Sequence, residues 1–153
     1  MSSAQPGASQ GPGIGHRSIE GTLSRSVLRF NLANEIDQLH RDESWLHPTG
    51  RSSKTLVKYT DLRIVLIAMK ANTRMHGHKA AGRISVHSLN GHIRLHLLKQ
   101  VVDLPAGHLV ALDQNVPHDV EATEESAFLL TLSWPQETNV AKARTRRKRT
   151  TRH

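Results

Sequence analysis

Between Asn72 and Ala122, two sets of regularly spaced turn residues and histidines restrict the chain to a small all-β fold. The first set reads NTRMHGHKAAGRISVHSLNG, and the second follows after fifteen residues and reads GHLVALDQNVPHDVEA. Each set combines turn residues with the short runs of Val, Ile and Leu that are typical of strands. Asparagine tolerates the left-handed backbone conformation better than most residues other than glycine, so Asn72 suits a turn as Gly107 does.

Short apolar segments recur along the chain with turn residues between them, a pattern that predicts an all-β sandwich or barrel. Asn90-Gly91 is the favoured pair for a two-residue hairpin turn. After it, Ile93 and Leu95 alternate with polar residues, which predicts a strand with a solvent-facing outer side. The predicted strands cover residues 55–59, 62–69, 83–89, 92–98, 101–104, 108–112, 117–122 and 127–134.

The spacing of the first set resembles the first motif of the cupin family, G(x)5HxH(x)3-4E(x)6G. Laid on without gaps, this motif places Asn72 at its opening glycine, His78 at its first histidine and Gly91 at its closing glycine. The second histidine and the glutamate of the motif fall on Ala80 and Ile84. Two of the residues that bind metal in the family are therefore replaced here by hydrocarbon side chains.

The second set resembles the second cupin motif, G(x)5PxG(x)2H(x)3N. It begins at Gly107, and Asp113 and Asn115 take the proline and second glycine positions. His118 keeps the histidine of the motif, whereas Ala122 replaces the final asparagine. The four metal ligands of the family are thus reduced to two.

The tripeptide His76-Gly77-His78 offers a second register, with His76 as the first histidine of the motif. That register would place Lys70 at the opening glycine and would find no glutamate downstream at the required spacing. The ungapped register explains more of the pattern.

The resemblance implies a single small antiparallel β-barrel, cupin-like or jelly-roll-like, over residues 18–135. A short helix is expected before the strands, because Asn31 can cap a helix whose Leu32, Ile36 and Leu39 share one apolar face. The second predicted strand, residues 62–69, is apolar on nearly both faces, so the N-terminal segment or a second subunit should cover its outer side. We therefore predict a homodimer, which the resemblance also favours.

Both ends of the chain are predicted to be disordered. Residues 1–17 are rich in Gly, Pro, Ser and Gln and hold too little apolar surface to offset the entropy of ordering. Residues 136–153 form a basic tail: from position 142 onward the chain has seven Lys and Arg and no acid, whereas residues 1–141 carry 14 Lys and Arg against 13 Asp and Glu. The formal charge of +8 therefore comes almost entirely from the tail.

The tail is a candidate for weak, nonspecific polyanion binding, because clustered cations attract phosphate backbones without reading sequence. No aromatic side chain lies among its cations to stack on bases. The candidate residues are Arg144, Arg146, Arg147, Lys148 and Arg149.

The candidate ligand pocket is formed by His78, His118, Ile84 and Val86 inside the predicted barrel. The resemblance implies a bound divalent transition metal, Fe, Mn, Ni or Zn, held by His78, His118 and a third imidazole. His76 is the candidate for that third position, because residues two apart on a strand face the same side. With hydrocarbon at two ligand positions, the pattern favours a metal-free barrel with a dry interior that suits an apolar or amphipathic molecule.

Two main functions follow from this pocket. The first is a small-molecule-binding or sensing module without catalytic machinery, and the second is a metal-dependent cupin enzyme, of the dioxygenase or isomerase type, using the three histidines. A third interpretation is a nucleic-acid-associated protein acting through its tail. The chain has no cysteine, no run of apolar residues long enough to span a membrane and no visible signal peptide, so a cytoplasmic protein is expected.

Overall fold

The computed structural model describes residues 26–135, in which two helices precede nine strands. Both predicted disordered ends, the start of the domain at residue 18, and the candidate tail arginines and lysine lie outside these residues. The elements are α1 (Leu32–Leu39), α2 (Glu43–Leu46), β1 (Arg51–Lys58), β2 (Leu62–Met69), β3 (Thr73–His78), β4 (Arg83–Asn90), β5 (His92–His96), β6 (Val101–Pro105), β7 (Leu109–Leu112), β8 (His118–Ala122) and β9 (Ser126–Ser133).

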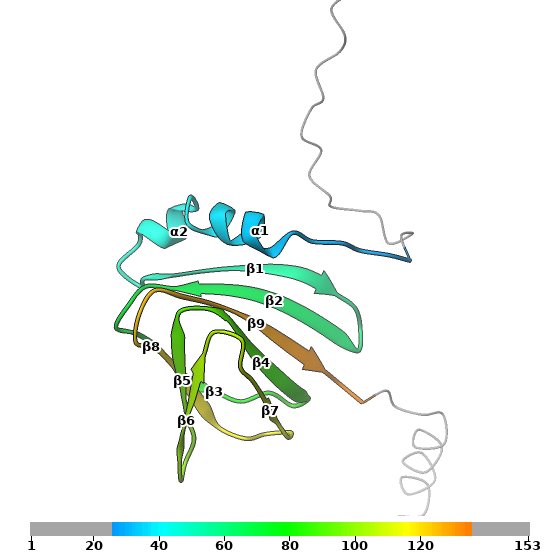
Figure 1. Cartoon of the computed structure of the whole chain (residues 1–153). Helices are drawn as coiled ribbons and strands as arrows, with labels where there is room; N and C mark the ends of the chain where they lie inside the picture. Colours follow the sequence, from blue (N-terminus) through cyan, green and yellow to red (C-terminus); the bar gives the residue numbers. More distant parts are fainter. Residues whose placement is uncertain (1–25, 136–153) are drawn as a thin grey trace, which may run out of the picture.

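The strands form two antiparallel sheets that face each other. One sheet has the order β1-β2-β9-β4-β7 and the other the order β3-β8-β5-β6 (Figure 1). The predicted all-β, jelly-roll-like class is confirmed, although the described strands form two separate hydrogen-bonded sheets and no closed barrel. The main core lies between the sheets and includes Phe128, Ile93 and Leu95, each no more than 1% exposed.

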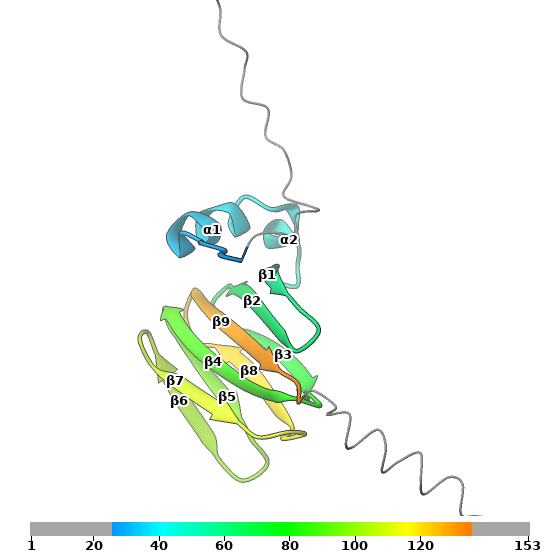
Figure 2. The same cartoon turned by 90° about the vertical axis from the view of Figure 1, so that its right-hand side faces the viewer.

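The predicted N-terminal helix is present, and a second, shorter helix follows it. Asn31 caps α1 as expected, because its side-chain oxygen accepts a hydrogen bond from the Asn34 backbone N–H at 3.2 Å. Ile36 and Leu39 are buried, as is Trp45 in α2. Both helices lie over the outer side of the five-stranded sheet, above β1 and β2 (Figure 2).

Strand β2 is covered on both faces by other described parts of the chain. Ile67 and Met69 face the core between the sheets, whereas Leu66 and Ala68 pack with the helices in a second apolar cluster. The N-terminal segment therefore covers the outer face of β2, for which a second subunit was the alternative cover. The homodimer remains a prediction, and the apolar surface of β2 is no longer an argument for it.

The predicted hairpin at Asn90-Gly91 is wrong. Strand β4 pairs with β7 and β9, whereas β5 pairs with β6 and β8, so the chain crosses from one sheet to the other at Gly91. Gly91 has φ +75°, and a Cβ there would lie 2.2 Å from the backbone oxygen of Glu125. A left-handed residue is needed both in tight hairpins and at this crossing, and the sequence signal is the same for both.

The four glycine positions of the two motifs all adopt the left-handed conformation. Their φ values are +61° at Asn72, +75° at Gly91, +85° at Gly107 and +59° at Asn115. The two asparagines are the only residues other than glycine with positive φ in the described part of the chain. These angles support the ungapped register.

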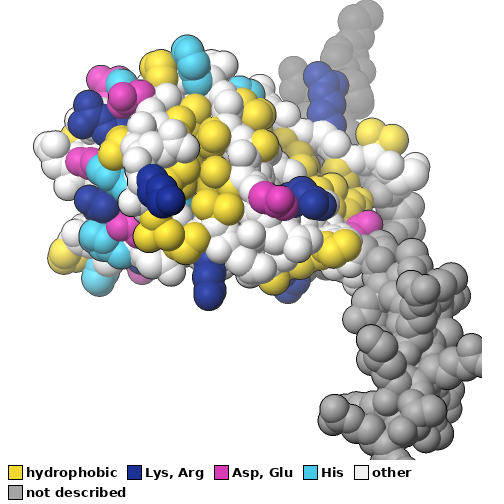
Figure 3. Space-filling model, turned by 90° about the horizontal axis from the view of Figure 1, so that it is seen from below, with side chains coloured by type: hydrophobic (Ala, Val, Ile, Leu, Met, Phe, Trp, Pro, Cys, Tyr) yellow, Lys and Arg dark blue, Asp and Glu magenta, His cyan; other side chains and the backbone are white. Residues whose placement is uncertain are grey.

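The outer face of the four-stranded sheet is polar, as the alternation in 92–98 predicts. His92 and Arg94 both contact the Asp103 carboxylate, at 3.0 and 2.8 Å, and His96 contacts Glu121 at 2.5 Å. Histidine, acidic and basic side chains gather at the left edge of the face shown in Figure 3, whereas hydrophobic side chains occupy its centre. No helix within residues 26–135 is long and apolar enough to cross a membrane.

Candidate functional site

A cavity of about 120 Å³ lies between the two sheets. All four predicted pocket residues, His78, Ile84, Val86 and His118, line this cavity. Most of its wall is hydrocarbon. The remaining lining residues are Ile67, Met75, Lys79, Ala80, Val120, Phe128, Leu130 and Leu132.

A bulge in strand β3 places His78 at the cavity. Met75 pairs with Val120 and His78 pairs with His118, so two residues of β3 lie opposite the single residue Asp119. An extra residue of this kind changes the alternation of side chains along the strand. The rings of His78 and His118 consequently lie in the same cavity, with centroids 6.2 Å apart.

The same bulge keeps His76 apart from the other two histidines. The His76 side chain is 71% exposed, and its Nδ1 lies 3.3 Å from a carboxylate oxygen of Asp119. It does not line the cavity. The structure therefore brings together His78 and His118 but not the third imidazole of the predicted metal site, because strict alternation does not hold across Gly77.

Asp119 holds the bulge in place. Its carboxylate accepts hydrogen bonds from the Gly77 backbone N–H at 2.7 Å and from Arg74 Nη2 at 3.0 Å. These contacts, the Gly77 N–H above all, lower the pKa of Asp119 from 3.8 to about 2. The ionised carboxylate accepts these hydrogen bonds more strongly than the protonated form does, so we expect its charge to help hold the bulge beside His78.

Replacing Asp119 with alanine should lower the melting temperature and remove an acid-dependent part of the stability. Because the folded-state pKa is depressed, the carboxylate stabilises the fold fully above about pH 4, and this contribution is lost as the pH falls toward 2. Thermal unfolding measured from pH 6 to pH 2 tests this. Asp37→Ala, which removes an exposed carboxylate from α1, is the matched control. An unchanged acid profile in Asp119→Ala would contradict the proposed role.

His118 is buried and its ring is fixed by one hydrogen bond. Its Nδ1 lies 2.9 Å from the backbone oxygen of Val116, and a carbonyl only accepts, so Nδ1 carries the proton. In the neutral ring, Nε2 is then the nitrogen with the lone pair. In that form, His118 offers the cavity an acceptor rather than a donor.

His78 lies where the cavity meets solvent, because its side chain is exposed and the neighbouring Lys79 also lines the cavity. Partial burial, and then the nearby His118 ring, lower the pKa of His78 below its usual value of 6.5. The ring is therefore neutral at pH 7. A neutral imidazole provides one donor and one acceptor.

The residues present do not fit a cupin-type metal centre. Transition metals in such sites need several nitrogen or oxygen ligands, and only two imidazoles line this cavity. Ala80 and Ile84, at the other two ligand positions, supply hydrocarbon. In residues 26–135, no three His, Cys, Asp or Glu side chains are grouped in a way that could hold a metal ion.

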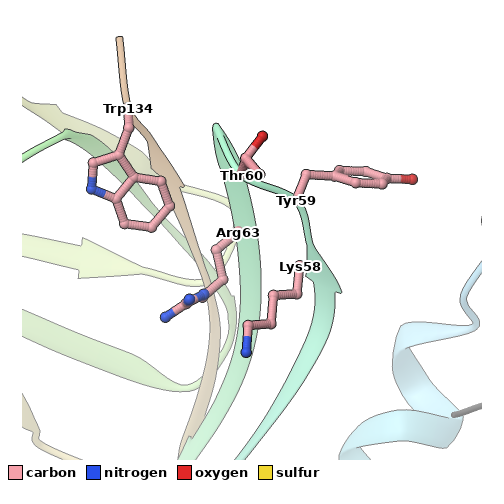
Figure 4. Close-up of a pocket in the computed structure, with 5 residues that line it drawn as sticks. All are labelled: Lys58, Tyr59, Thr60, Arg63 and Trp134. Atoms are coloured by element: carbon pink, nitrogen blue, oxygen red, sulfur yellow. The ribbon is translucent and has the colours of Figure 1, made fainter. Parts of the chain in front are cut away.

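A second hollow, which sequence reasoning missed, lies where β1 turns into β2 and β9 ends. It is open, has a volume of about 640 Å³, and is lined by Lys58, Tyr59, Thr60, Arg63 and Trp134 (Figure 4). The Arg63 guanidinium lies 5.6 Å from the centre of the Trp134 ring. The sequence placed Trp134 at the end of the last predicted strand, residues 127–134, but gave no signal that its side chain meets Arg63.

Comparison with known proteins finds no matching family model and no matching curated protein. Solved structures do match. A conserved protein of unknown function from Streptococcus pyogenes is 22% identical, with a TM-score of 0.55 over 60% of this chain and 80% of that one. A cupin-2 domain-containing protein from Shewanella frigidimarina is 16% identical, with a TM-score of 0.54 over 69% of this chain and 94% of that one.

A cupin 2 conserved barrel domain protein from Leptotrichia buccalis is 27% identical over 57% of this chain, with a TM-score of 0.54. The match covers 43% of that longer chain. These likenesses show that this chain has the cupin fold, as its motif spacing predicts. The matched proteins include cupins of several kinds, so the likeness does not distinguish a binding module from an enzyme.

Proposed function

We propose that this protein is a small-molecule-binding module whose ligand is a small, uncharged, apolar molecule bearing one hydroxyl group. The observation that carries the proposal is the pair of imidazoles, His78 and His118, in a cavity whose other lining residues, apart from Lys79, are hydrocarbon. The cupin fold supports a binding function in general terms, and the side chains of this cavity define the class of ligand.

The size of the cavity limits the apolar part of the ligand. An apolar protein cavity of about 150 Å³ is known to hold a benzene molecule. At about 120 Å³, this cavity accommodates a body of similar or slightly smaller size. Ile84, Val86 and Phe128 provide dry walls for it, so the favourable free energy of binding comes mainly from removing apolar surface from water.

The histidines select the polar group of the ligand. His118 Nε2 accepts a hydrogen bond, and His78 can donate one from its neutral ring. A hydroxyl satisfies both, because it donates to one imidazole and accepts from the other. A carboxylate only accepts, so it would meet the lone pair of His118 and would require that ring to take up a proton.

Phenol should bind more tightly than anisole, which has a similar body but no hydroxyl hydrogen, and more tightly than benzoate at pH 7.5. Anisole can still accept from His78 but cannot donate to His118, and the lost hydrogen bond, worth about 1 kcal/mol, would give phenol an advantage of about fivefold. Titration followed by NMR of the imidazole resonances measures these affinities. Equal binding of phenol and anisole, or stronger binding of benzoate, would contradict the proposed ligand class.

The variant His118→Leu separates the role of the imidazole from that of the apolar walls. It should remove the preference for phenol over anisole while retaining binding of the apolar body. His47→Ala is the matched control, because His47 is exposed at the end of α2 and does not line the cavity. If the variant folds poorly, the comparison of phenol with anisole in the wild type still tests the proposed ligand class.

A further inference from the structure

We propose that the hollow formed by Lys58, Arg63 and Trp134 is a second binding site, which takes single-stranded nucleic acid. It is separate from the cavity between the sheets, since the two share no lining residue. The proposal does not depend on the proposed function. It rests on the charges of the hollow, on its partly exposed aromatic ring and on the basic sequence that follows residue 135.

The two cations of the hollow lie directly opposite each other. Lys58 and Arg63 are register partners on the neighbouring strands β1 and β2. Like charges in such positions are destabilising, so the pair does not serve the stability of the sheet. Within residues 26–135 neither side chain has an acidic partner within ion-pair distance, and Arg63 Nε is buried there without a hydrogen-bond partner. An anion bound in the hollow would provide the negative charge and the hydrogen-bond acceptor that Lys58 and Arg63 lack.

The aromatic ring is held beside these cations and remains partly exposed. The backbone N–H of Trp134 donates to the carbonyl of Asp61 at 3.0 Å, which fixes the end of β9 against the β1–β2 turn. Figure 4 shows Arg63 between Lys58 and Trp134, whereas the Tyr59 ring points away from the indole. An indole next to cations provides both groups that single-stranded nucleic acids use, a surface for base stacking and charges for phosphates.

The sequence beyond the fold favours a polyanion rather than a small anion. The described chain ends at residue 135, next to Trp134, and residues 142–153 carry seven Lys and Arg without an acid. In the sequence, the basic tail therefore starts two residues after Trp134, which lines the hollow. A chain with this excess of positive charge attracts polyanions, and the hollow contributes the aromatic ring that the tail lacks.

Binding of a 20-nucleotide oligo(dT) to the full chain tests the proposal, with tryptophan fluorescence and anisotropy as readouts. The oligonucleotide should quench the wild type but not Trp134→Leu, which retains only Trp45. The variant should also bind about tenfold more weakly, because stacking on one base is worth about 1–3 kcal/mol. The double variant Lys58→Ala/Arg63→Ala should lower the slope of log K against log salt by about 1.4.

Two controls make the result specific to the hollow. Lys99→Ala removes an exposed cation from the β5–β6 turn in the other sheet and should bind as the wild type does. Replacing the five tail residues Arg144, Arg146, Arg147, Lys148 and Arg149 with glutamine should weaken binding but leave the quenching at saturation. Circular dichroism checks that Trp134→Leu is folded, and the double variant at the hollow tests the same site independently.

Three outcomes would overturn the proposal. If the hollow variants bind as the wild type does and only the tail substitutions abolish binding, the tail acts alone. Duplex DNA that binds as tightly as oligo(dT), without quenching, would show that stacking has no part. Polyglutamate that competes as well as oligo(dT) at equal charge would assign the surface to acidic polypeptides instead.

Discussion

The double variant Ala80→His/Ile84→Glu should bind Ni²⁺, Mn²⁺ and Zn²⁺ at least about a hundredfold more tightly than the wild type, a change of about 2.7 kcal/mol. The substitutions restore an imidazole and a carboxylate at two positions that already line the cavity with His78 and His118. Metal affinity rises with the number and charge of the ligands. A carboxylate buried at position 84 is also costly without a cation, so metal should raise the melting temperature of the variant far more than that of the wild type.

Further substitutions identify the ligands of the restored site. In the double variant, His78→Ala should abolish tight binding, whereas His76→Ala should leave it intact because His76 lies outside the cavity and contacts Asp119. Titration calorimetry and thermal shift with each metal measure these effects. A wild type that binds metal tightly and loses it on His76→Ala would show that His76 turns inward, and that the preference for a metal-free barrel is wrong.

The motif spacing predicted the fold because it records backbone geometry rather than side-chain chemistry. Asn72 and Asn115 stand where the family pattern has glycine, and both adopt positive φ. A left-handed position can be met only by a few residue types, so its spacing is preserved in the sequence even when the metal ligands are absent. The same spacing placed His78, Ile84 and His118 at positions that face the family's pocket, and all three line the cavity.

The position of His76 could not be predicted, because side-chain alternation was assumed to continue through the strand. The bulge at Gly77 adds one residue to β3. The Gly77 backbone N–H donates a hydrogen bond to the carboxylate of Asp119 on another strand. A long-range hydrogen bond of this kind leaves no periodic signal. The crossing at Gly91 was misread for a related reason, since a local turn signal does not specify which sheet the next strand joins.

The hollow at Trp134 also could not be predicted, because it depends on contacts between residues far apart in the sequence. Lys58 and Arg63 are paired on β1 and β2, and the sheet order β1-β2-β9 brings Trp134, directly after β9, beside them. Sequence reasoning found the cations of the tail and noted that no aromatic side chain lies among them. The aromatic ring is on the fold, at the point where the described chain ends, and pairing between strands distant in sequence places it beside the cations.

Gly91→Ala should destabilise the protein by about 2–5 kcal/mol, because the new Cβ meets two independent costs. The φ of +75° is strained for an L-residue by about 1–2 kcal/mol. The Cβ would also lie 2.2 Å from the Glu125 backbone oxygen and 2.5 Å from Ser126 Oγ. Relieving an overlap of this kind typically costs about 1–3 kcal/mol. Urea unfolding measures the loss.

Two other glycines separate these costs. Gly107 has φ +85°, but a Cβ there would meet nothing within 4 Å, so Gly107→Ala should show the backbone strain alone. Gly82 has no positive φ, but its Cβ would lie 2.1 Å from the Ser133 backbone oxygen, so Gly82→Ala should show the overlap alone. The loss in Gly91→Ala should therefore approach the sum of the other two losses. A Gly91→Ala variant no less stable than Gly107→Ala would mean that Glu125 and Ser126 move aside at little cost, and that the sheet crossing tolerates a side chain.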